Sequence, residues 1–84
     1  MKNALFTIVD EKAHSINAVF LAVSVEVAKR MVHSSFAGGD SLIRRYPADF
    51  ALVRLGDIDC CSGAITALQV PSLVCKLDEL FHED

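Results

Sequence analysis

The stretch "DFALVRLGDIDCCSGAITALQV", residues 49–70, carries the clearest fold signal in the chain. Two apolar runs, residues 49–56 and 64–70, flank the connection "DIDCCSG". Aspartate and glycine favour turns, because aspartate bonds nearby backbone N–H groups and glycine accepts a positive φ. The stretch therefore predicts a β-hairpin, with Gly63 at a positive-φ turn position and Pro71 at the end of the returning strand.

The first half of the chain predicts one further strand and one long helix. "LFTIVD", residues 5–10, has the β-branched and aromatic composition of a strand, and "EKAHSIN" has the polarity of a turn. The apolar run at residues 18–23 is a second strand or the lead-in to a helix, because its periodicity fits both. Residues 24–36 predict a helix, since Ser24 is a good N-cap. Its apolar stripe has spacings of three and four and comprises Val25, Ala28, Val32 and Phe36, with Met31 beside it.

The remaining segments complete an α+β domain. Gly38 and Gly39 are expected to end the main helix, and Asp40 or Ser41 to cap a short helix through "SLIRR". The segment after Pro71 is expected to begin extended and to finish as a short helix at residues 76–82. The predicted fold is a small antiparallel sheet covered by one main helix, with a C-terminal hairpin and a short terminal helix.

Length and composition indicate one small domain, residues 1–84, that buries a core. The chain has 84 residues, of which 52% are hydrophobic. No apolar run approaches the roughly 20 residues of a membrane helix, and no signal peptide is recognisable, so a reducing cytoplasm is the expected compartment. The net charge is −3, and four of the 11 acidic residues lie in an acidic tail at residues 77–84. The rest of the chain is close to neutral, which does not favour strong non-specific nucleic-acid binding.

The cysteines and aspartates have two interpretations: they form a metal or redox site, or they are free thiols and turn-forming residues. Cys60 and Cys61 are adjacent and Cys75 stands alone, which does not match the paired spacing of zinc ligands. We therefore expect free thiols, no cofactor and no metal. Asp49, Asp57 and Asp59 would be the residues of a small metal-dependent enzyme, but turn formation accounts for aspartates here more simply. No residue pattern marks a nucleophile, so we expect no enzyme activity and name no catalytic residue.

The basic residues are the candidates for a nucleic-acid site. Cations near an exposed aromatic ring can follow a single strand by charge and by base stacking. The alternative is a solvated surface with weak ion pairs. The candidate residues for binding single-stranded DNA are Lys29, Arg30, Arg44, Arg45, Arg54 and Tyr46.

The segment "SLIRRYPADFALVRLGDIDCCSGAI" resembles the small non-structural protein of gokushovirus-type microviruses, which are single-stranded DNA bacteriophages of the Microviridae. The similar motifs are Tyr-Pro-x-Asp-Phe at residues 46–50, Leu-Gly-Asp at 55–57, and the opening "LFTIVDEKA". The chain departs from that pattern at Cys60–Ser62, where the turn usually carries acids and threonine, and at Val19–Phe20.

This resemblance implies a non-enzymatic accessory protein in the cytoplasm of an infected bacterium, one that binds DNA or assists single-stranded genome synthesis and packaging. The alternative is a homo-oligomeric protein-interaction module that acts on viral capsid or replication proteins without touching DNA. The high apolar fraction of so short a chain favours that alternative.

Overall fold

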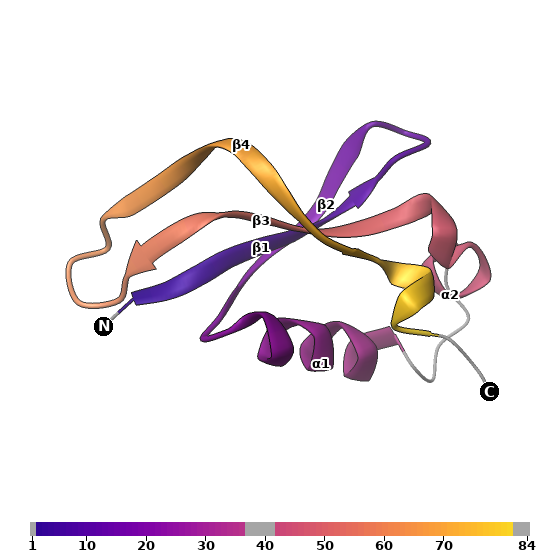
Figure 1. The fold of residues 1–84 in the computed structure, drawn as a ribbon, viewed down its shortest axis with the longest axis horizontal. Helices are drawn as coiled ribbons and strands as arrows, with labels where there is room; N and C mark the ends of the chain where they lie inside the picture. Colours follow the sequence, from indigo (N-terminus) through magenta and orange to yellow (C-terminus); the bar gives the residue numbers. More distant parts are fainter. Residues whose placement is uncertain (1, 37–41, 82–84) are drawn as a thin grey trace.

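Four antiparallel strands form one sheet in the order β2-β1-β3-β4, and α1 lies against one of its faces (Figure 1). The structure is a computed structural model that describes residues 2–36 and 42–81. The elements are β1 (Lys2–Asp10), β2 (Ser15–Ala22), α1 (Val25–Phe36), α2 (Leu42–Arg45), β3 (Phe50–Asp59) and β4 (Ile65–Lys76), with the short 3-10 turns η1 (Pro47–Asp49) and η2 (Leu77–Glu79). The predicted small antiparallel sheet with one main helix is confirmed, and strands predominate over helices. No described helix is long and apolar enough to cross a membrane.

Helix α1 begins where the sequence predicts it. The Ser24 hydroxyl accepts a hydrogen bond from the Val27 N–H at 3.2 Å, and the Ser24 carbonyl accepts one from Ala28 N–H at 3.0 Å. The first bond satisfies a donor that the first helical turn would otherwise leave open, and the second is the first regular hydrogen bond of the helix. Ala28 and Val32 are 0% and 2% exposed, so the predicted apolar stripe does face the sheet. Met31, which we placed beside the stripe, is 40% exposed and lies at the edge of this contact.

The inward side chains of the two central strands, β1 and β3, form the core together with the buried face of α1. Phe6 and Ile8 come from β1, while Phe50 and Leu52 come from β3, and all four are buried. Ile8 pairs with Leu52 across the two strands, and the Phe6 ring stacks on Phe20 of β2 with centroids 5.9 Å apart. Alternation along the strands therefore directs one apolar row toward α1.

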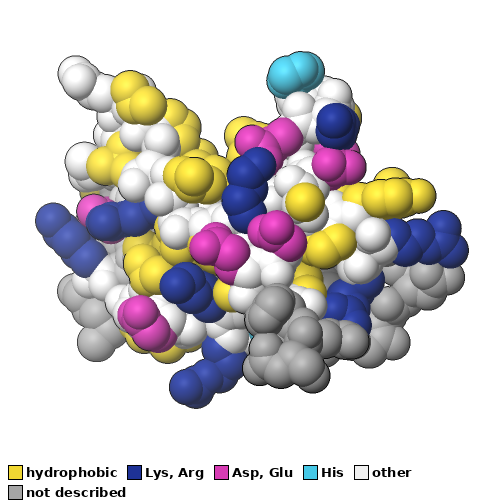
Figure 2. All heavy atoms as spheres, turned by 45° about the vertical axis from the view of Figure 1, so that its right-hand side comes forward, with side chains coloured by type: hydrophobic (Ala, Val, Ile, Leu, Met, Phe, Trp, Pro, Cys, Tyr) yellow, Lys and Arg dark blue, Asp and Glu magenta, His cyan; other side chains and the backbone are white. Residues whose placement is uncertain are grey.

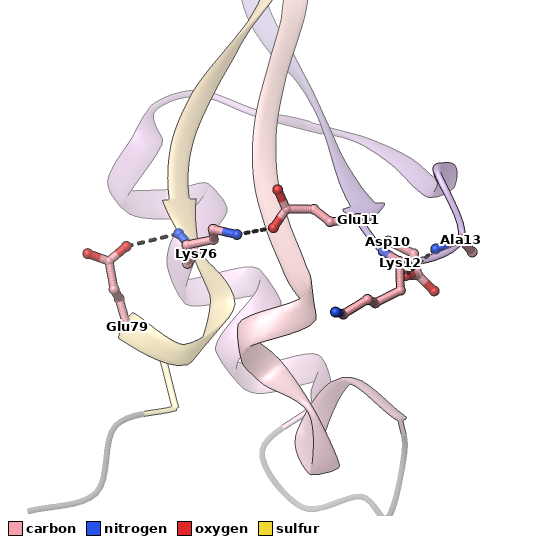
Figure 3. Close-up of polar contacts among 6 residues, drawn as sticks. All are labelled: Asp10, Glu11, Lys12, Ala13, Lys76 and Glu79. Atoms are coloured by element: carbon pink, nitrogen blue, oxygen red, sulfur yellow. Dashed lines mark hydrogen bonds and ion pairs between the residues drawn. The ribbon is translucent and has the colours of Figure 1, made fainter.

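The residues left undecided by the sequence, 18–23, belong mainly to strand β2 and not to a helix. A four-residue turn, residues 11–14, joins β1 to β2. The Asp10 carboxylate accepts hydrogen bonds from the N–H groups of Lys12 and Ala13 at 3.0 and 3.1 Å (Figure 3). Near the same turn, Glu11 forms an ion pair with Lys76 at the end of β4. The pair links the β1–β2 turn to the far edge of the sheet.

The predicted β3–β4 hairpin is present, but its connection is shorter than expected. Strand β3 continues through Asp57 to Asp59, so those residues pair with β4 or β1 and do not lie in a loop. The Asp59 N–H donates to the Ala64 carbonyl at 2.9 Å, and the Gly63 N–H donates to the Asp59 carbonyl at 2.7 Å. Gly63 has φ 81°, which confirms its positive-φ position.

The prediction that Pro71 ends the returning strand is wrong. β4 runs through Pro71 to Lys76, because it is an edge strand and proline is tolerated where no ladder bond is needed. Residues 68–71 form an irregularity, since Gly56 pairs with Ala67 and Arg54 pairs with Ser72. On β3, only Leu55 lies between Arg54 and Gly56, so four residues of β4 lie opposite one residue of β3.

The predicted terminal helix at 76–82 is also wrong in extent. The strand continues to Lys76, and only the single turn η2 follows. Leu77 begins that turn and Phe81 follows it, and both side chains are buried, so core contacts decide the path of this segment. Several expectations concern residues outside those that the structure describes, namely Gly38, Gly39, Asp40, Ser41, His82, Glu83 and Asp84.

Candidate nucleic-acid interface

Five of the six candidate residues lie on α1, on α2 or directly after α2. Lys29 and Arg30 are in the middle of α1, and Arg44, Arg45 and Tyr46 lie in or just after α2. We call this set, with His33 and Phe81, the basic corner. The basic corner thus combines cationic side chains with two aromatic rings.

Phe81 joins the two helices of the basic corner. Its ring stacks on the His33 imidazole, with centroids 5.5 Å apart and an angle of 21° between planes. The guanidinium carbon of Arg44 lies 4.9 Å from the centre of the same ring. A cation over an aromatic face is attracted by the ring quadrupole. The C-terminal segment therefore holds Arg44 beside the last turns of α1.

Helix α2 is short, and a single buried residue anchors it. Ile43 is 7% exposed and belongs to the core, while the neighbouring Leu42 is 62% exposed. The Tyr46 N–H closes the turn by donating to the Leu42 carbonyl at 2.8 Å, and Pro47 then begins η1. Tyr46 is 55% exposed. Its ring and the exposed Arg45 are thereby presented on the surface.

Acidic groups limit the positive potential near the corner. The pKa of the Cys75 thiol is raised mainly by burial; nearby Lys29 lowers it, whereas Glu79 and Asp78 raise it. Lys29 and the carboxylates of Asp78 and Glu79 therefore all lie near the Cys75 thiol, so the positive charge of Lys29 is offset there. Figure 2 shows basic and acidic side chains interleaved over the visible face, with no continuous basic patch there. The Glu79 carboxylate accepts a hydrogen bond from the Lys76 N–H at 2.9 Å (Figure 3).

Arg54 is not part of the basic corner. It lies on the same side of β3 as Phe50 and Leu52, but next to the opposite end of α1. An extra residue, Leu55, interrupts the alternation, so Arg54 and Asp57 point to the same face. Their Nη2 and Oδ1 atoms are 2.5 Å apart, in an ion pair with side chains 39% and 33% exposed.

The surroundings of Arg54 form a separate polar cavity of about 180 Å³. Lys2, Ser24 and Asp57 also line this cavity. Ser24 precedes the first turn of α1 and His33 lies in the last, roughly 14 Å further along the helix at 1.5 Å per residue. The structure therefore places the predicted residues in two regions: Arg54 lies beside the start of α1, and the other five belong to the basic corner.

The three aspartates considered as metal ligands do not come together. Asp49 immediately precedes β3, whereas Asp57 and Asp59 are at its other end, roughly 25 Å away along an extended strand. The Asp59 carboxylate accepts hydrogen bonds from the Cys61 and Ser62 N–H groups at 2.9 and 3.3 Å. These two bonds are the main cause of a lowered pKa for Asp59. Within residues 2–36 and 42–81, no cluster of three potential metal-ligating side chains occurs.

The cysteines lie in two different environments and are all free thiols. Cys60 and Cys61 are exposed in the β3–β4 turn, and Cys75 is buried in the core. Cys75 pairs with Leu52 across the strands and behaves as a small apolar side chain. The expectation of free thiols is thus confirmed for this structure.

Phe81 and His33 of the basic corner are not among the residues that the sequence predicts for the site. Neither residue has a local sequence signal for this role, because the two rings meet only when the chain returns to the end of α1 after β4. A second unexpected feature is an apolar cavity of about 200 Å³ between α1 and the β1–β2 pair. Phe20, Met31 and Val32 are among its lining residues.

Comparison with known proteins gives one match. Residues 3–80 match the family described as phage ORF5 protein, which covers nearly the whole chain. No curated protein and no solved structure matches the chain. With the match spanning every described strand and both helices, the chain belongs to the phage ORF5 protein family and is a bacteriophage protein.

Proposed function

We propose that this phage protein is a non-enzymatic accessory factor that binds single-stranded DNA through the basic corner. It would act in the cytoplasm of the infected bacterium, in genome synthesis or packaging. The observation that carries the proposal is the arrangement around Phe81, where His33 and Arg44 stack on one ring. The exposed Tyr46 beside Arg45 adds an accessible aromatic surface. Such a combination suits sequence-tolerant binding by charge and stacking.

The electrostatics predict modest affinity with a clear dependence on salt. The chain has a net charge of −3, so binding would depend on local cations. Each neutralised phosphate contributes a slope of roughly −0.7 to the logarithmic salt dependence for a single strand. Three or four phosphate contacts at the basic corner would therefore give a slope of about −2 to −3.

The test is fluorescence polarisation with a labelled single-stranded oligonucleotide at increasing salt concentration. The double variant Arg30→Glu with Arg45→Glu reverses two exposed cations of the basic corner. We expect at least a tenfold loss of affinity and a slope that becomes shallower by about 1 or more. Arg44 is unsuitable for this test because its contact with Phe81 also contributes to packing.

The matched control is Lys2→Glu with Lys12→Glu, which makes the same change in net charge outside the basic corner. This control should retain most of the affinity. Equal losses in the two double variants would show that only net charge matters, and would reject the basic corner as the site. Absence of binding by the unmodified chain at low salt would reject direct DNA contact altogether.

A protein-interaction role without DNA contact is the second candidate, acting on viral capsid or replication proteins. Its support is the distribution of exposed apolar side chains. Among the described residues, eleven large hydrophobic side chains are exposed, and seven of these lie on the two edge strands β2 and β4. That distribution leads to a more specific inference, which is independent of DNA binding.

A further inference from the structure

The face of the sheet opposite α1 carries an apolar row that crosses all four strands. Thr7 pairs with Val19 on β2 and with Val53 on β3, and Val53 pairs with Leu73 on β4. Thr7, Val19 and Val53 alternate with the core residues of their strands, so they point away from α1. Leu73 lies on the same side because it pairs with Val53 across a register shift. A second row, Leu21–Leu5–Gly56–Ala67, runs beside the first. We call these two rows the open face.

The first row of the open face is buried at its centre and exposed at its rims. Thr7 and Val53 are 0% and 8% exposed, whereas Val19 and Leu73 at the edges are 57% and 61% exposed. Figure 1 shows the start of β4 and the β1–β2 turn both bending away from α1. Figure 2 shows two projections on either side of a hollow, with apolar side chains gathered on one of them.

Gly56 allows β4 to lie unusually close to β3 within the open face. A Cβ atom at this position would lie 2.9 Å from the Ala67 Cα and closer still to the Thr66 carbonyl oxygen. Only a residue without a Cβ allows the two backbones to come so near. The close approach of β4 to β3 at this point is therefore built into the sequence.

The strand residues of the open face are almost free of charge, and the charged side chains near it lie mainly in the β1–β2 turn. Residues 62–75, which include most of β4, contain no acidic, basic or histidine residue, and the same holds for β2. Lys76 pairs with Ala51 across the strands and so lies on this side of the sheet, where it forms an ion pair with Glu11. The neighbouring charges thus cancel each other.

We propose that the open face binds a second copy of this chain in a two-fold dimer. In such an interface each patch meets the identical patch of its partner, so any net charge on it would repel itself. A charge-free apolar face with a neutral ion pair at its margin satisfies that condition. A partner of different sequence would impose no such requirement.

The size of the molecule is compatible with this dimer. A standard interface takes about 800 Å² from each partner. The two longer extents of the molecule are 40 and 24 Å, so a contact of that size would occupy most of one face. A chain of 84 residues also gains by burying more apolar surface than it can cover alone.

Side chains, and not an added strand, would hold the two copies together. Pro71 and the irregularity at residues 68–71 interrupt β4, and both features discourage edge-to-edge strand pairing. Leu73 and Val19 are the rim residues most directly placed for contact. Contact through the open face would leave the basic corner accessible in each copy.

The test is the mass of the full chain in solution under reducing conditions, measured by sedimentation and light scattering. We expect a dimer of about 18 kDa, twice the 9.1 kDa of one chain. Leu73→Glu should raise the dissociation constant at least tenfold, because two like charges would then face each other. The matched control is Leu42→Glu on α2, since Leu42 is 62% exposed, almost the same as Leu73, and should leave the dimer intact.

Each possible result decides the matter. A monomer at several hundred micromolar, equal dissociation by both variants, or a mass that keeps growing with concentration would overturn the proposal. A dimer that disappears only on adding reductant would also overturn it, because Cys60 and Cys61 are exposed and would then be the link. If Leu73→Glu fails to fold by circular dichroism, Val19→Glu at the opposite rim serves as the second variant.

Discussion

The inner and outer halves of the β3–β4 hairpin are similarly apolar but lie in different surroundings. In the inner half, Phe50, Leu52 and Cys75 are 4%, 0% and 7% exposed. In the outer half, every residue from 64 to 70 is exposed, including Ile65 at 62% and Val70 at 77%. The difference is that α1 and the η2 turn pack against the inner half. An apolar pattern therefore identifies a strand, but a second layer decides whether its side chains are buried.

The largest expected effect comes from removing a side chain of the inner half. Leu52→Ala should lower the free energy of unfolding by roughly 2–5 kcal/mol, because Leu52 is fully buried and leaves a cavity. Leu68→Ala in the outer half should cost less than about 1 kcal/mol. Both are measured by urea unfolding in the Leu73→Glu background, so that association does not contribute. Similar losses for the two variants would mean that the halves are equally packed.

The strands and main helix were predictable because their signals are local. Ser24 caps α1 through its own hydroxyl, and the spacing of Ala28 and Val32 follows from one buried face. Pro71 was misinterpreted because its tolerance depends on β4 being at an edge, a property of the whole sheet. Likewise, pairing with β3 keeps the chain extended through Lys76, where the sequence predicts the start of a helix.

An intermediate effect is expected at the two glycines of the outer half, for different reasons. Gly56→Ala should destabilise the protein by about 1–3 kcal/mol, because β4 backbone atoms occupy the space of the new methyl group. Gly63→Ala meets no atom within 4 Å, so it should cost only the strain of its positive φ, about 1–2 kcal/mol.

Hydrogen exchange distinguishes the two glycine variants. Gly56→Ala should accelerate exchange of the β4 amides near Thr66, while Gly63→Asn should restore most of the stability lost in Gly63→Ala. Unchanged protection near Thr66 in Gly56→Ala would show that β4 is free to move away from β3 without cost.

The smallest effect concerns the pH dependence of the hairpin turn. The pKa of Asp59 lies below its ordinary value of 3.8, chiefly because the Cys61 and Ser62 N–H groups bond the carboxylate. A lowered folded-state pKa gives stability that is present above the unfolded value and is lost as the pH falls through the folded one. Unfolding curves between pH 5 and 2 should show a small loss in the original chain that Asp59→Asn lacks. Identical pH profiles would rule out this contribution.

The candidate site was predictable only in part. Charge and sequence proximity suggested Lys29, Arg30 and the pair Arg44–Arg45, and the structure places these on α1 and α2, which Phe81 bridges. The role of Phe81 was not predictable, because its ring reaches His33 only through the path of the chain after β4. Arg54 lies apart from the other candidates, and the extra residue Leu55 brings Asp57 to the same face as its partner.

The central position of β1 has a consequence for how the chain acquires its structure. β1 pairs on one side with β2, directly after it, and on the other with β3, where Asp10 meets Phe50. A two-stranded hairpin alone is marginal in water. During translation, the first two strands and α1 must therefore wait for β3 to leave the ribosome before a stable sheet can form. Such distant pairing makes folding slow relative to helical domains of the same size. A nascent chain cut short before residue 50 would expose its apolar strands to the cell.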